Sequence, residues 1–236
     1  FIDESLLRRG IPTLNAHWSP GATVLTGDYI FAKAAHLASE GGTIELMRLF
    51  ASSLMTIVAG EVSQLFSSNG HSLETMYFKR IHAKTAALFT LSCEIGSRLG
   101  SVPDSLLPPI RTFGSNIGNA FQIIDDILDF SGSSAALGKP VGGDLRRGIV
   151  TLPAIYFFES SPDTPVVRAL LDHQKIADPD MNKLVNAIRD SDALMRSRER
   201  ASALIEEGVS AISHLPACQE KDALIELAAF IANRAE

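Results

Sequence analysis

Apolar residues recur every three or four positions along most of this chain, and this spacing limits what it can fold into. Such a period places the apolar side chains on one face of an α-helix. On this ground, helices are expected at residues 26–39, 44–66, 73–99, from the turn at 101–109 to about 130, and at 149–160. The helix at 44–66 has so few polar positions that it should be buried on most sides.

The remaining segments fit the same class of fold. The Gly- and Ser-rich stretch at 131–148 is expected to be a loop, and PDTP at 162–165 a turn. The residues that follow have the spacing of shorter, more highly charged amphipathic helices. No segment shows the alternation of a half-buried strand, and there is no internal repeat or low-complexity linker. The sequence therefore predicts one all-α domain over residues 1–236, packed as a bundle of roughly ten helices.

The composition supports a sizeable core and excludes several classes of protein. Of the 236 residues 46% are hydrophobic, which excludes general disorder. The net charge of −6 argues against a nucleic-acid partner. No apolar run is long enough for a transmembrane segment. The two distant cysteines, Cys93 and Cys218, fit neither a disulfide framework nor a zinc site, so we expect a reducing, cytoplasmic location.

The most unusual stretch is FQIIDDILDF at residues 121–130, which sets three aspartates among large apolar residues. On a helix Asp125 and Asp129 are one turn apart and share a face, Asp126 lies beside them, and Gln122 lies one turn before Asp125. Three carboxylates this close repel one another, and hard oxygen ligands suit Mg²⁺. A solvated acidic face is the ordinary explanation for D-D-x-x-D alone. The apolar neighbours instead favour an acidic patch at the mouth of an apolar cavity.

Basic residues form the complement to this patch, and each group also has a plain structural explanation. Arg8 and Arg9 are adjacent and could bind anionic oxygens, or could simply lie in an exposed loop. Lys84 and Thr85 interrupt an apolar helix, where a snorkelling lysine and a back-bonded threonine are the alternatives. Lys139 precedes a further charged group, GGDLRRG. Together the carboxylates, the cations and the apolar helices indicate a ligand with a diphosphate head and a hydrocarbon tail.

Several blocks of the sequence resemble the trans-isoprenyl diphosphate synthase (polyprenyl synthetase) family, in the same order and over essentially the whole chain. The two long blocks are GNAFQIIDDILDF and LGKPVGGDLRRGIVTLP, and the others are IDESLLRRGIPTLNAHW, LTGDYIFAKAA, GEVSQL and KTAALF. The resemblance implies an isoprenoid synthase-type helical bundle around a deep apolar cavity. It also implies that a first D-D-x-x-D motif should end at Asp3 and that the family's N-terminal portion is absent. Family members are usually homodimers, which we expect here.

The resemblance also implies a role for individual residues. Asp3, Asp125, Asp126 and Asp129 would bind Mg²⁺, with about three ions at the allylic diphosphate. Phosphate groups would be bound by Arg8, Lys84 and Lys139 on the allylic substrate, and by Arg9 on isopentenyl diphosphate. Thr85, Gln122 and the Lys84 carbonyl would face the allylic cation. Phe121 would pack near the isopentenyl tail, and Gln64 would line the cavity.

The implied function is that of a Mg²⁺-dependent prenyltransferase. It would condense isopentenyl diphosphate with an allylic prenyl diphosphate to give a longer all-trans polyprenyl diphosphate, and it would release pyrophosphate. Many short-chain members have a lysine where this chain has Ile149, which hints at a longer product. Two alternatives stay open: a non-catalytic regulatory subunit of a heteromeric synthase, and a class I terpene cyclase. Paired aspartates directly before Phe1 would favour the enzyme.

Overall fold

The computed structural model describes residues 6–8, 11–41, 43–65, 72–131, 141–172 and 174–234. Asp3, Arg9 and Lys139, and the side chains of Arg8 and Gln64, lie outside this description. The chain divides into two compact units, Phe1–Ser52 and Ser53–Glu236. The single-domain organisation expected from the sequence stays a prediction.

The first unit begins with a short hairpin and continues as helices. Strands β1 (Leu7–Arg8) and β2 (Ile11–Pro12) pair antiparallel, and they are followed by α1 (Leu14–His17) and α2 (Pro20–Glu40). The sequence pattern does not reveal these strands, because two residues are too few to show an alternation of apolar and polar positions. Helix α2 begins earlier than predicted, since Ser19 caps its N-terminus and Pro20 takes the first turn.

Helix α3 (Ile44–Leu65) has the bounds that the sequence predicts and runs from the first unit into the second. The expectation that it is buried on most sides is wrong for this single chain. Ile44, Met55 and Val58 are 74%, 72% and 58% exposed. A helix with few polar positions is expected to have its surface covered. The pattern does not tell whether the covering residues belong to the same chain or to another chain.

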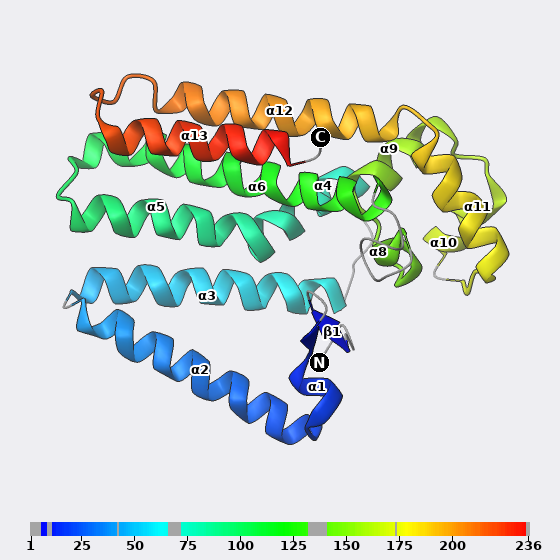
Figure 1. Ribbon diagram of the computed structural model, residues 1–236, viewed down its shortest axis with the longest axis horizontal. Helices are drawn as coiled ribbons and strands as arrows, with labels where there is room; N and C mark the ends of the chain where they lie inside the picture. Colours follow the sequence, from blue (N-terminus) through cyan, green and yellow to red (C-terminus); the bar gives the residue numbers. More distant parts are fainter. Residues whose placement is uncertain are drawn as a thin grey trace. The chain divides into compact units, whose positions relative to one another are not determined.

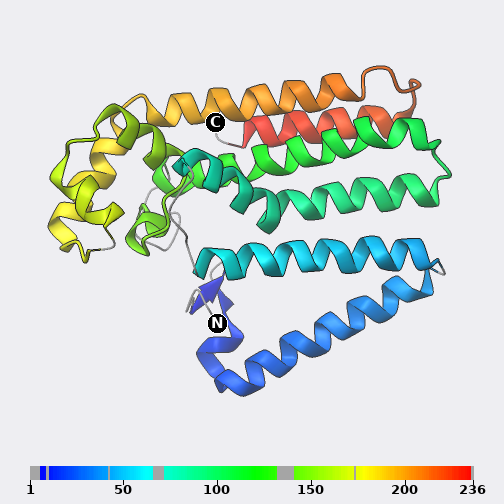
Figure 2. The same ribbon diagram turned by 180° about the vertical axis from the view of Figure 1, so that it is seen from behind.

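The second unit is a bundle built around one long helix, α6 (Leu107–Ser131). In Figures 1 and 2, α5 (Ala87–Leu99), α12 (Ala193–Ala211) and α13 (Gln219–Asn233) lie alongside it. The other α- and 3₁₀-helices that the structure describes in this unit are α4 (Leu73–Ile81), η2 (Asp104–Leu106), α8 (Gly143–Arg146), α9 (Leu152–Ser160), α10 (Pro165–Leu171) and α11 (Asp178–Arg189). The short helix α8 lies within the stretch expected to be a loop. The all-α class is confirmed.

The helix predicted over 73–99 is interrupted by one π-helical turn, η1 (His82–Ala86), between α4 and α5. Two glycines allow this turn to pack closely. A Cβ on Gly118 of α6 would lie 2.5 Å from the Ala86 Cα, and a Cβ on Gly60 of α3 would lie 2.4 Å from the Ala83 Cβ. π-Turns are rare and are often found at functional sites. This one contains Lys84 and Thr85.

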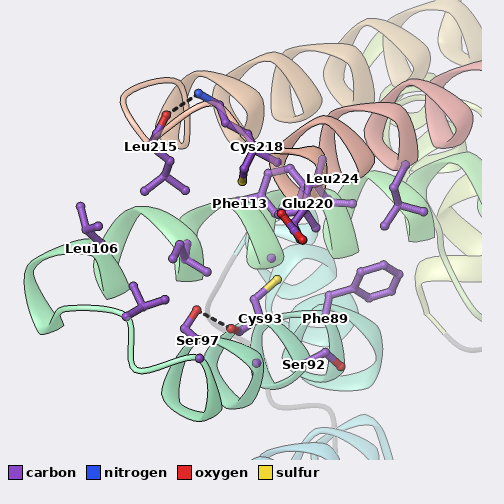
Figure 3. A pocket seen from close by; sticks show the side chains of 18 of the residues that line it. Phe89, Ser92, Cys93, Ser97, Leu106, Phe113, Leu215, Cys218, Glu220 and Leu224 are labelled. Atoms are coloured by element: carbon purple, nitrogen blue, oxygen red, sulfur yellow. Dashed lines mark hydrogen bonds between the residues drawn. The ribbon is translucent and has the colours of Figure 1, made fainter.

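An apolar cavity of about 1000 Å³ lies between α5, α6, α13 and the connection that precedes α13 (Figure 3). Its lining includes Phe89, Cys93, Phe113 and Leu224, whose side chains surround one space. No helix among the described residues is long and apolar enough to cross a membrane.

Candidate active site

The D-D-x-x-D stretch lies near the C-terminal end of α6, and its neighbours are buried as the sequence predicts. Ile123, Ile124 and Ile127 are at most 1% exposed. The helix therefore turns its apolar face into the core and carries the carboxylates on the adjoining faces. The three aspartates meet three different surroundings.

Asp126 is buried at 4% exposure and is held by two hydrogen bonds. The Tyr77 hydroxyl of α4 donates to Asp126 Oδ2 at 2.8 Å, and Gln122 Nε2 donates to Asp126 Oδ1 at 2.9 Å. Both bonds are made inside the protein, where an unpaired carboxylate would be costly. Asp126 therefore links α4 to α6.

Thr85 extends this network onto the π-turn. Its Oγ1 donates to Gln122 Oε1 at 2.7 Å, so the alternative of a back-bonded threonine is not what the structure shows. The sequence predicted that Thr85 and Gln122 belong to one site, although they lie 37 residues apart. Because the extra residue of a π-turn rotates the side chains that follow it, η1 is the element that aims Thr85 at Gln122.

Asp129 is engaged by backbone groups at the start of α8. The backbone N–H of Gly143 donates to Asp129 Oδ1 at 3.2 Å, and that of Asp144 donates to Oδ2 at 3.1 Å. These N–H groups open α8, which has no side-chain cap of its own. Gly142 reaches this position with φ 71°, in the left-handed region that favours glycine. Asp129 thus fixes the start of the GGDLRRG block beside the acidic patch.

Asp125 differs because its side chain is exposed and accepts no hydrogen bond from any described residue. The positive charge of Arg234, which directly follows α13, lowers the pKa of Asp125 and so partly compensates its negative charge. The same guanidinium lies over the Phe121 ring, 4.8 Å from its centroid, and Phe121 contacts Phe89 at 5.5 Å between ring centroids. Phe89 lines the apolar cavity. The free Asp125 carboxylate therefore lies one helical turn after Phe121, which contacts a ring that lines the apolar cavity.

The negatively charged form is disfavoured at all three aspartates. Burial raises the pKa of Asp125 and Asp129 and raises the pKa of Asp126 to about 7, while Asp144 adds repulsion to each. Arg234 opposes the shift in the pKa of Asp125, and hydrogen bonds oppose it for the other two. Although the Asp125 side chain is exposed, the crowded protein atoms around it exclude part of its water. A bound cation would relieve this repulsion.

The donor set fits a hard divalent cation, with Asp125 as the available ligand. Among the described residues no three His, Cys, Asp or Glu side chains form one metal-binding group. Asp126 and Asp129 point toward other partners, and Asp3 lies outside the description. A carboxylate oxygen that accepts one hydrogen bond keeps another lone pair, so these two can still assist. Few direct carboxylates and several waters are typical of Mg²⁺ sites.

Lys84 lies beside the network on the same π-turn. Its Nζ is 3.3 Å from Glu61 Oε1 of α3, and the two side chains are 45% and 32% exposed. Such a partly exposed pair is worth little, so a stronger anion can displace Glu61. The structure thus brings together Lys84, Thr85, Gln122 and Asp126, with Phe121 and Asp125 next to them on α6.

Sequence reasoning missed three residues of this site: Tyr77, Arg234 and the carboxylate of Asp144 as a member of the acidic patch. Tyr77 precedes Ile81 and Thr85 at successive intervals of four, the spacing of one helix face. That spacing was the available signal. No sequence signal pointed to Arg234, which comes close to Phe121 only through the packing of α13 on α6.

Comparisons with known proteins agree with this site. The family model for Polyprenyl synthetase matches residues 1–188. The heptaprenyl diphosphate synthase component 2 of Geobacillus stearothermophilus is 33% identical over 235 residues, which cover 99% of this chain and 72% of the relative. An all-trans-nonaprenyl-diphosphate synthase (geranyl-diphosphate specific) of Rhodobacter capsulatus is 35% identical over 230 residues, covering 96% and 70%.

Solved structures show the same relationship and confirm the isoprenoid synthase-type fold. A polyprenyl synthase from Caulobacter crescentus CB15, complexed with calcium and isoprenyl diphosphate, superposes with a TM-score of 0.89 at 32% sequence identity. The match covers all of this chain and 73% of that one. The chain therefore belongs to the polyprenyl synthetase family and is an enzyme of the prenyltransferase class.

Proposed function

We propose that this protein condenses isopentenyl diphosphate with an allylic prenyl diphosphate and so makes a longer all-trans polyprenyl diphosphate in a Mg²⁺-dependent reaction. One observation carries the proposal. A free carboxylate, Asp125, lies on the same helix as a hydrogen-bonded polar group, Gln122–Thr85, and both adjoin aromatic rings that lead to an apolar cavity. A charged head, a reactive carbon and a hydrocarbon tail need these three surroundings in this order.

The residues of this chain divide the work by chemistry. Asp125 is the carboxylate most open to a metal ion, with Asp126 and Asp129 in support and Asp3 as a further ligand. When bound, the metal ions supply positive charge that stabilises the departing diphosphate. Lys84 exchanges Glu61 for phosphate oxygens.

Other predicted residues act at the two substrate heads and at the reacting carbon. Arg8 and Lys139 add charge at the allylic diphosphate, and Arg9 binds the isopentenyl diphosphate head. The Thr85 and Gln122 oxygens and the Lys84 carbonyl face the electron-poor allylic carbon once its diphosphate leaves. The C–C bond forms when the isopentenyl double bond attacks this carbon, and released pyrophosphate takes the proton. Family members use divalent metal ions, and calcium accompanies isoprenyl diphosphate in the Caulobacter relative.

The hydrocarbon tail is proposed to extend from Phe121 past Phe89 into the apolar cavity, with Gln64 on the wall. The lining there is apolar along α5, α6 and α13, so a prenyl chain loses no hydrogen bond by entering. Exclusion of water also protects a carbocation from being quenched. A cavity of about 1000 Å³ exceeds the space that a short prenyl group fills, which agrees with a longer product.

A second candidate function rests on a specific comparison. The Geobacillus relative is component 2 of a heptaprenyl diphosphate synthase, and its name implies a second component. This chain would then work in a heteromer. The apolar side chains exposed on α3, Met55 and Val58, suit a partner surface, and a homodimer would cover them equally. We propose the homodimer, and light scattering of the purified protein tests it.

The experiment for function uses the full-length gene product with Mg²⁺, labelled isopentenyl diphosphate and allylic primers of several lengths. The products are separated by chain length. A ladder of prenyl products that disappears with EDTA and returns with Mg²⁺ is expected. A folded dimer that gives no product with any allylic primer would contradict a stand-alone enzyme, and restoration by a second subunit would identify the heteromer. A cyclic hydrocarbon would identify a terpene cyclase.

A further inference from the structure

Three hydrogen bonds join Tyr77, Asp126, Gln122 and Thr85 into one chain of contacts that crosses from α4 through α6 to the π-turn. The Tyr77 hydroxyl and Gln122 Nε2 both donate to the Asp126 carboxylate, at 2.8 and 2.9 Å. Thr85 Oγ1 donates to Gln122 Oε1 at 2.7 Å. Tyr77 and Asp126 are 1% and 4% exposed, so water does not compete for their bonds.

The chemistry of the carboxylate sets the direction of every bond in this chain. Both Asp126 oxygens accept in this network, one from Tyr77 and one from Gln122, so Gln122 presents its NH₂ group to Asp126. The Gln122 carbonyl then faces Thr85, and the Thr85 hydroxyl must donate to it. Because the Thr85 hydroxyl proton is engaged with Gln122, the oxygen lone pairs of Thr85 are left for another partner.

Tyr77 itself is fixed by its packing. Its ring makes an edge contact with Phe78 at 5.4 Å between centroids, and the Arg80 guanidinium lies 5.5 Å from the ring centroid. Arg80 in turn donates to the Val150 carbonyl at 2.7 Å. A buried hydroxyl held on several sides can position its acceptor without moving, and buried networks of this kind are rigid when every member is satisfied.

We propose that Tyr77 and Asp126 are positioning residues that fix the Gln122 amide so that Thr85 presents its lone pairs to the electron-poor carbon of the allylic substrate. This rests on the proposed prenyltransferase reaction. Thr85 acts as the group next to the substrate, and Tyr77 acts only through Asp126 and Gln122. The role assigned to Asp126 is thus different from that of a primary metal ligand.

Tyr77→Phe tests the first part, because it removes one hydroxyl and leaves the ring. Loss of a hydrogen bond worth about 1.4 kcal/mol corresponds to about a tenfold fall in kcat. KM for both substrates and the Mg²⁺ concentration for half-maximal rate should stay within about twofold. Tyr156→Phe is the matched control, since it removes a half-buried hydroxyl that donates to Glu74 at 3.4 Å, and kcat should be retained.

Asp126→Asn tests the direction of the chain without changing its size. The new amide would present its carbonyl to Tyr77 and its NH₂ to Gln122. The Gln122 amide would then turn and make Thr85 an acceptor, which consumes a lone pair. We expect kcat to fall at least tenfold, with the Mg²⁺ requirement raised by much less than the loss in kcat. In a Thr85→Val background, Tyr77→Phe should lower kcat by less than about twofold, since its effect passes through Thr85.

The inference is overturned if Tyr77→Phe retains full kcat. It is also overturned if either variant raises the Mg²⁺ requirement in proportion to the lost activity, or if the Tyr77 and Thr85 effects are independent. Circular dichroism and thermal unfolding of each variant separate misfolding from misplacement, and Asp126→Asn decides the question if Tyr77→Phe does not fold. An inactive wild-type protein would refute the proposed function instead, and the two failures are therefore distinguishable.

Discussion

Gly118→Ala should displace the π-turn η1 from α6, because there is no room for a methyl group between them. A Cβ at this position would lie 2.5 Å from the Ala86 Cα, 2.9 Å from the Ala86 Cβ and 3.1 Å from the Phe89 Cβ. The closest of these atoms belongs to the backbone and cannot rotate away. To reach ordinary van der Waals contact at 3.4 Å, η1 must move by about 0.9 Å.

That movement acts directly on the candidate site. Ala86 follows Thr85, and Gly118 precedes Gln122 by one turn on the same face of α6. The 2.7 Å bond between Thr85 and Gln122 is therefore lengthened. Overpacking costs about 3 kcal/mol where the backbone must shift, against a gain of about 1 kcal/mol for replacing a helical glycine, so the free energy of unfolding should fall by about 2 kcal/mol. A misplacement near 1 Å lowers the rate by roughly 100-fold.

The assay pairs kcat from labelled isopentenyl diphosphate with urea unfolding followed by circular dichroism. Gly96→Ala is the matched control, because Gly96 is also within a helix and a Cβ there meets nothing within 4 Å. It should retain kcat and be stabilised by about 0.5–1 kcal/mol. If Gly118→Ala is as stable and as active as Gly96→Ala, the close packing of the π-turn is not what positions Thr85.

Three further predictions concern charge, cavity and substrate binding. Because the folded-state pKa of Asp126 is raised to about 7, the free energy of unfolding of the metal-free protein should fall as the pH rises from about 4 to about 7. Asp126→Asn should abolish this fall, which is of order 4 kcal/mol and is measured by urea unfolding with EDTA. An Asp126→Asn variant no more stable than wild type at pH 8 would contradict this. Gly96 lines the apolar cavity, so Gly96→Phe should shorten the product by about one isoprene unit. Gly27→Phe, where a Cβ also has no atom within 4 Å, should leave the product length unchanged. Equal product lengths from the two variants would exclude this cavity as the tail site. Lys84→Ala should raise KM for the allylic diphosphate about 10-fold or more without a large change in stability. Lys183→Ala removes another lysine from an exposed ion pair and should leave KM unchanged. An unchanged KM in both variants would show that Lys84 does not bind the substrate.

The helices were predictable because their signal is local. Residues 44–66 and 149–160 match α3 and α9 within a few residues, since apolar spacing and proline or glycine boundaries act along the chain. The π-turn was not predictable from spacing. Its extra residue is stabilised by close approach to Gly60 and Gly118, which lie far from it in sequence.

The site divides along the same line. The aspartate cluster, Lys84 and Thr85 could each be singled out from the sequence because apolar helices seldom carry such groups. What each carboxylate contacts depends on tertiary packing. The resemblance implies one metal-binding role for all of the aspartates, and the structure adds separate hydrogen-bond partners: Asp126 accepts from Tyr77, and Asp129 accepts from the start of α8. These partners come from separate elements, and no local pattern reports them.

Single-turnover product formation by Asp125→Asn tests the central claim most directly. Asn keeps the size of the side chain but removes the free carboxylate that we assign to the metal ion. Asp163→Asn, on an 88% exposed side chain far from α6 in sequence, is the control. The account predicts that Asp125→Asn folds normally, forms product at least about 100-fold more slowly and needs more Mg²⁺, while Asp163→Asn matches wild type. Wild-type turnover and an unchanged Mg²⁺ requirement in Asp125→Asn would contradict it.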